Sequence, residues 1–129
     1  MSRAATVGVI AGLVGGSSWI AKLVIMAFQG GPDPQSVPES IAFFAGLLGV
    51  AVAAAALGVL LTRGRPAVAR LAAALGAVVC VALLIGAGQA LLTALPGDSW
   101  IQEEAVFGVL GLLAIIMAVM LRQRESRPA

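Results

Sequence analysis

The sequence predicts an all-α membrane protein, folded as an antiparallel bundle of four transmembrane helices with both termini in the cytoplasm. Of its 129 residues, 60% are hydrophobic and only 11% are charged, whereas soluble domains carry about 25% charged residues. The apolar residues gather in four stretches, each close to the roughly 20 residues that a helix needs to cross a bilayer. Short breaks rich in proline, glycine or arginine separate the stretches.

We expect one transmembrane domain, residues 1–129, with helices at about 5–29, 38–62, 66–95 and 100–122. The first break holds three prolines and two glycines, which cannot continue a helix. The second is a tight turn, in which Gly64 suits a helix C′ position and Pro66 a first helical turn. Ser36 with Glu39, and Ser99 with Gln102, fit capping boxes before the second and fourth helices. Connections this short make consecutive helices antiparallel neighbours.

The arginines predict the orientation. The breaks on one side of the expected bundle hold no Lys or Arg. The arginines lie at the opposite side: Arg3, Arg63, Arg65, Arg70, Arg122, Arg124 and Arg127. The positive-inside rule places this side on the cytoplasmic face of the membrane, which we expect to be the plasma membrane. The first helix is not expected to be a cleaved signal peptide, because it contains Lys22 and lacks a small-x-small site before Gln29. Abundant alanine, and arginine in preference to lysine, suggest a GC-rich bacterial source.

Composition argues against several function classes. The chain has no histidine and one cysteine, Cys80, so zinc sites built on histidine, histidine-ligated haem and cysteine-held clusters lack their ligands. We therefore predict no catalytic residue, metal or cofactor, and no enzymatic activity. The net charge of +2 comes from residues at helix ends and does not indicate nucleic-acid binding. The expected partner is the lipid bilayer.

A row of small residues in the first helix predicts close helix packing. Gly8, Gly12 and Gly16 are spaced by four, as in the GxxxG patterns that let helix backbones approach in lipid. The row fits two arrangements: packing within the four-helix monomer, or an interface between copies of the chain.

Lys22 is the most unusual residue, because it lies about six residues, or roughly 9 Å, inside the expected end of its helix. A lysine near a helix centre costs on the order of 2.5–3.5 kcal/mol by insertion scales. On a helical wheel Lys22 continues a small and polar stripe with Ser18, and Gln89 in the third helix lies at a similar depth with Thr93 one turn outward. Lys22, Ser18, Gln89 and Thr93 are therefore predicted to form a polar layer, with Glu39 or Glu104 as the counter-charge. In the alternative arrangement, Lys22 extends its stem toward the headgroups.

The sequence resembles no family by its motifs, and two functions remain open. The first is a non-enzymatic accessory or structural subunit, which packs against a larger membrane complex or against its own copies. The alternative is a small oligomeric transporter or channel that uses the polar layer around Lys22 and Gln89.

Overall fold

The computed structural model describes residues 1–97 and 99–126, and these residues form four α-helices and no strand. The helices are α1 (Arg3–Gln29), α2 (Val37–Leu61), α3 (Ala67–Ala94) and α4 (Trp100–Ser126). All four are long and apolar enough to span a membrane, which confirms the four predicted spans. Asp98 and Arg127 lie outside the described residues.

The helix bounds differ from the expected ones mainly at the end of α4. This helix continues to Ser126, one turn beyond the predicted end at residue 122. Apolarity marks only the part of a helix that lies in lipid, and Arg122, Gln123, Arg124 and Glu125 are good helix formers that extend it into the polar region. The other bounds agree within two residues.

The helix starts show where the capping predictions hold. Ser2 caps α1 by accepting a hydrogen bond from the Ala5 backbone N at 3.2 Å, a cap that the apolar pattern alone did not indicate. Ser36 caps α2, accepting from the Glu39 backbone N at 3.4 Å. The carboxylate of Glu39 does not return to Ser36 and accepts from the Asp33 backbone N at 2.9 Å, so this capping box is only half formed.

The connection between α3 and α4 differs from its prediction. Ser99 Oγ accepts from the Ile101 backbone N at 3.2 Å. Gln102 does not close the box: its amide donates to the carbonyl oxygens of Leu92 at 2.8 Å and Leu95 at 3.3 Å. Gln102 thus satisfies carbonyls that the end of α3 leaves open, and it ties the start of α4 to the end of α3.

The turn between α2 and α3 also departs slightly from expectation. Gly64 has a φ of 80°, the left-handed conformation that glycine adopts without strain, but it lies two residues beyond the cap Thr62 rather than next to it. Pro66 is the residue before α3, not part of its first turn.

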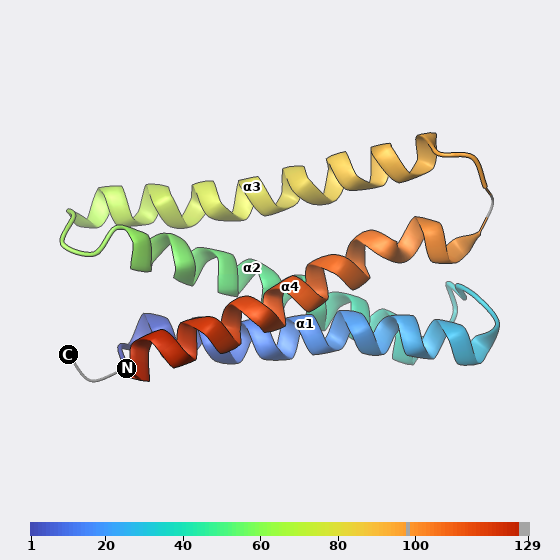
Figure 1. The fold of residues 1–129 in the computed structure, drawn as a ribbon, viewed down its shortest axis with the longest axis horizontal. Helices are drawn as coiled ribbons and strands as arrows, with labels where there is room; N and C mark the ends of the chain where they lie inside the picture. The colour runs from blue at the N-terminus through green and yellow to red at the C-terminus, as the bar shows by residue number, and fades with distance from the viewer. Residues whose placement is uncertain (98, 127–129) are drawn as a thin grey trace.

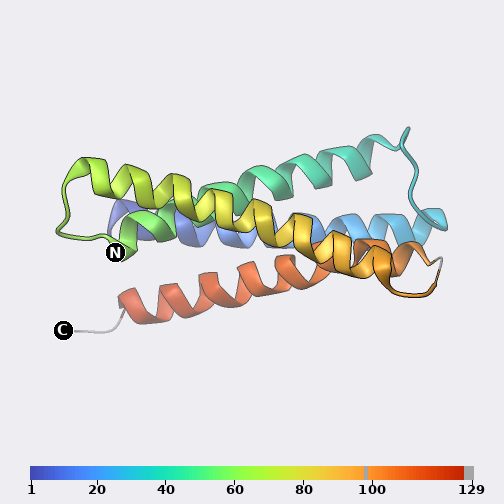
Figure 2. The same ribbon diagram turned by 90° about the horizontal axis from the view of Figure 1, so that it is seen from above.

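Figures 1 and 2 show the arrangement of the helices. The start of α1, the α2–α3 turn and the last turn of α4 share one end, which we call the arginine end; the other two connections share the opposite end, the acidic end. Helix α1 packs against both α2 and α4, and α2 also packs against α3. Helices α3 and α4 lie near each other at the acidic end and diverge toward the arginine end (Figure 1).

The glycine row of α1 is used in contacts within the chain. A methyl group added at Gly8 would lie 3.2 Å from Cβ of Ala56 in α2, and one at Gly12 would lie 3.1 Å from Cβ of Ala118 in α4. One at Gly16 would collide with a backbone carbonyl of α4. Of the two arrangements considered for this row, the described residues form the intramolecular one.

Candidate functional site

A buried ion pair joins α1 to α4. Among the described residues Lys22 is the one charged residue that is buried, with 5% of its surface exposed. Its Nζ donates to Glu104 Oε2 at 2.6 Å. The side chain of Glu104 is 18% exposed, so the carboxylate retains some access to its surroundings whereas the ammonium has little.

The close contact between α1 and α4 explains why these two residues meet. The helices approach at Gly16 and Gly111, where neither residue has a side chain to hold the backbones apart. Lys22 follows Gly16 by six residues and Glu104 precedes Gly111 by seven. At about 1.5 Å per residue, both therefore lie roughly 9–11 Å from the crossing, toward the acidic end.

Two phenylalanine rings enclose the lysine ammonium. Lys22 Nζ lies 4.4 Å from the ring centroid of Phe107 in α4 and 4.9 Å from that of Phe43 in α2. Both distances are within the range in which a ring quadrupole attracts a cation. The two rings also contact each other edge to face, with centroids 5.6 Å apart. Residues of two other helices, α2 and α4, thus stabilise Lys22.

Trp19 packs against the two phenylalanines that surround Lys22, Phe43 and Phe107. It is fully buried, its ring lies edge to face with Phe107 at 5.1 Å, and its Nε1 donates to the backbone carbonyl of Phe43 at 3.2 Å. The ring lies directly over Gly46, where any side chain would collide with it. Helix periodicity and depth do not predict these aromatic partners; the one signal in the sequence is Trp19 itself, a tryptophan placed too deep for the interfacial belt.

The structure does not bring the remaining members of the predicted polar layer to Lys22. Ser18 Oγ donates to the Val14 carbonyl of its own helix at 2.7 Å, and Thr93 Oγ1 donates to the Gln89 carbonyl of α3 at 2.9 Å. Within the described ranges α1 and α3 do not pack against each other. Equal depth therefore does not place Gln89 beside Lys22, because α2 and α4 are the neighbours of α1.

Glu39, the other candidate counter-charge, has a different role. Its Oε2 accepts from Gln29 Nε2 at 3.1 Å and from the Asp33 backbone N at 2.9 Å. It therefore organises the connection between α1 and α2, and of the two acidic candidates it is Glu104 that binds Lys22.

A second ion pair lies at the arginine end. Arg63 Nη2 donates to Glu125 Oε1 at 2.7 Å and to Ser2 Oγ at 3.1 Å. The side chain of Arg63 is 53% exposed, so this pair is a surface contact that links the α2–α3 turn to α4 and to the start of α1.

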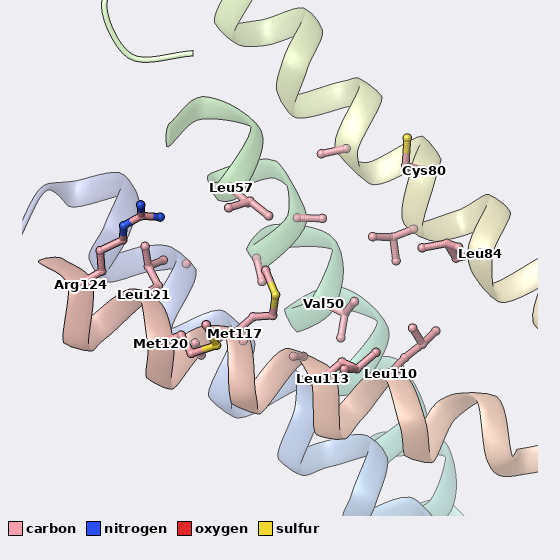
Figure 3. A pocket seen from close by; sticks show the side chains of 18 of the residues that line it. Val50, Leu57, Cys80, Leu84, Leu110, Leu113, Met117, Met120, Leu121 and Arg124 are labelled. Carbon is pink, nitrogen blue, oxygen red and sulfur yellow. The ribbon is translucent and has the colours of Figure 1, made fainter. Parts of the chain in front are cut away.

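An apolar wedge lies between the diverging halves of α3 and α4. Its volume is about 790 Å³, and all four helices contribute to its lining. Figure 3 shows Leu84 of α3 across the wedge from Leu110 and Leu113 of α4, with Val50 of α2 between them and Arg124 toward its other end. We refer to this space as the α3–α4 wedge.

Comparison of the chain with models of protein families, with curated proteins and with solved structures gave no match.

Proposed function

We propose that this protein is a non-enzymatic accessory or structural subunit of a plasma-membrane complex, and that it binds its partner through the outward face of α3. The observation that supports this most directly is the exposure of α3. None of its 28 residues is buried, although it is at least as apolar as the other three spans.

The outward face of α3 has the surface that a partner helix requires. It carries a row of small residues at four-residue spacing: Ala82, Gly86, Ala90 and Ala94. A Cβ built at Gly86 would meet no atom within 4 Å. Such a face lets a second backbone approach closely, which is how helices associate in lipid. The glycines of α1, by contrast, are already occupied within the chain.

The buried ion pair favours this proposal over a transporter or channel. The alternative function required a polar layer that joins Lys22 to Gln89, and these residues lie on helices that do not pack together in the described chain. The ammonium of Lys22 is also neutralised by Glu104 and enclosed by aromatic rings. We therefore assign Lys22 a structural role, which is to fasten α1 to α4.

Photo-crosslinking in intact cells tests the partner face. A photoreactive amino acid at Gly86 should give one product of discrete mass, and that partner should copurify with the parent chain in fixed stoichiometry. The matched control is the same amino acid at Ile10 of α1, which is 57% exposed but lies away from α3, and which should crosslink only to lipid. Gly86→Ile should abolish copurification. A product of twice the chain mass would assign the face to self-association, and lipid products alone at Gly86 would refute the proposal.

We also propose that the bundle is antiparallel in the membrane, with the arginine end in the cytoplasm. The helix ends that carry arginine in the described residues all meet at that end (Figure 1), in agreement with the positive-inside rule. In a Cys80→Ala background, Ser36→Cys should react with an impermeant thiol reagent in intact cells and Ser126→Cys should react only after lysis. The reverse pattern would contradict this orientation.

A further inference from the structure

We propose that the α3–α4 wedge binds one anionic phospholipid, with an acyl chain between the helices and the phosphate at Arg124. The wedge faces away from the small-residue row of α3: Ala77 and Val81 line it, whereas a Cβ on Gly86 would meet no atom within 4 Å. The lipid site is therefore separate from the partner face proposed above, and either proposal can fail without the other.

The chemistry of the lining fits a hydrocarbon chain. Apart from Cys80, Gln123 and Arg124, every residue that lines the wedge is aliphatic, alanine, glycine or methionine. The volume of about 790 Å³ is within the 300–1,000 Å³ typical of small-molecule sites. Met117 and Met120 contribute flexible side chains, which adapt to a mobile apolar ligand.

The wedge is closed toward the acidic end, which excludes a spanning helix as its occupant. There α3 and α4 come into contact: a Cβ on Gly88 would lie 2.9 Å from a methyl group of Val106. Gln102 also donates to the Leu92 carbonyl at 2.8 Å. A partner helix must run through the whole hydrocarbon core of about 30 Å, whereas this wedge ends before it reaches the far side.

The length of the wedge matches one leaflet. On α4 the lining runs from Leu110 to Arg124, fourteen residues apart in sequence, or about 21 Å along the helix. Half of the hydrocarbon core is about 15 Å, and the headgroup region adds several ångströms more. A lipid whose phosphate lies at Arg124 would thus have the end of its acyl chain near the bilayer midplane, where α3 and α4 converge.

The charge at the open end selects an anionic headgroup. Arg124 is exposed, and among the described residues it takes part in no ion pair, because Glu125 binds Arg63. Arg65, Arg70 and Arg122 lie at the same end, and no ion pair in the described ranges includes them. Arginine binds phosphate oxygens through paired N–H donors, and basic residues near the membrane surface attract anionic lipids.

Native mass spectrometry of the delipidated protein, titrated with palmitoyl-oleoyl phosphatidylglycerol or the matching phosphatidylcholine, tests the proposal. The parent chain should bind one phosphatidylglycerol about fivefold more tightly than phosphatidylcholine, the equivalent of about 1 kcal/mol for one basic contact. Arg124→Gln should remove this preference. Glycerophosphoglycerol, which is the headgroup without chains, should not displace the bound lipid.

Two filling variants test the location. Ala77→Phe should reduce binding of both lipids, and the matched control Ala72→Phe, on an exposed part of the same helix, should leave binding unchanged. Met117→Trp fills the wedge from α4 at a position that is 51% exposed, so it keeps the test valid if Ala77→Phe does not fold. Equal binding of the two lipids by the parent chain, or parent-like binding by a folded filling variant, would refute the proposal.

Discussion

Removing either partner of the Lys22–Glu104 pair should destabilise the protein, and the two losses should be unequal. Glu104→Gln leaves an ammonium whose side chain is 7% exposed without a counter-charge. Lys22→Met leaves a carboxylate whose side chain is 18% exposed and which lies in the second turn of α4, near the acidic end. The stranded lysine therefore has less access to water or headgroups than the stranded glutamate.

The burial of each group sets the expected magnitudes. An uncompensated buried charge costs about 3–5 kcal/mol, and we expect Glu104→Gln to lower the free energy of unfolding by about that amount. Lys22→Met removes a charged hydrogen bond and the contacts with two phenyl rings, so its cost should be roughly 1.5–3 kcal/mol. The double variant should be more stable than Glu104→Gln alone, because methionine fills the space between Phe43 and Phe107 without a charge.

Unfolding by heat or by denaturant, in one detergent, measures this double-mutant cycle. It compares the parent chain with the two single variants and the double variant. The Arg63–Glu125 pair provides the matched control: it has a similar distance of 2.7 Å, but Arg63 is 53% exposed, so Glu125→Gln should cost less than about 1 kcal/mol. If Lys22→Met were at least as stable as the parent chain, and the two single effects simply added, the ion pair would not fasten α1 to α4 and the reasoning from burial would fail.

Three further substitutions test the packing around this pair, each measured by unfolding in detergent. Gly15→Ala should lose about 1–3 kcal/mol, because its methyl group would lie 2.6 Å from the α2 backbone, whereas Gly86→Ala, which faces open space, should change stability little or increase it; equal effects would refute the packing. Gly46→Ala should cost a similar 1–3 kcal/mol, since Trp19 would have to move, and a parent-like value would contradict the contact. Trp19→Phe should cost about 1–3 kcal/mol, because it removes the hydrogen bond to the Phe43 carbonyl and part of a fully buried ring, and a neutral result would show that neither contributes.

Sequence reasoning predicted the spans well because the signal is local. Each apolar stretch must satisfy its own backbone in lipid, so length and composition are sufficient to identify a helix. The end of α4 was missed for the same reason: residues 123–126 are helical but polar, and apolarity cannot mark them. Glu104 was among the two candidate partners of Lys22 because both acidic residues lie near the ends of helices at the correct depth.

Short connections predict that consecutive helices are neighbours, but the contact between α1 and α4 could not be predicted in this way. Gln89 and Lys22 lie at similar depths along their helices, but depth says nothing about which helices touch. Adjacency depends on where small residues on two helices coincide, such as Gly16 with Gly111, and a chain with 16 glycines offers many pairings. The rings of Phe43 and Phe107 around Lys22 follow from the pairing that the fold adopts.

In this chain, the residues that hold the helices together differ from the surfaces that we propose for binding. Inserting Lys22 costs free energy that the fold offsets within α1, α2 and α4, through Glu104 and two aromatic rings. The groups that looked most functional by sequence are therefore engaged inside the bundle. The two surfaces proposed for binding are on and beside α3: its outward small-residue face and the apolar wedge with Arg124 near its open end. Because a helix in lipid gains no hydrophobic drive from burial, we propose that contacts specific to these two surfaces are the ones by which the protein recognises other molecules.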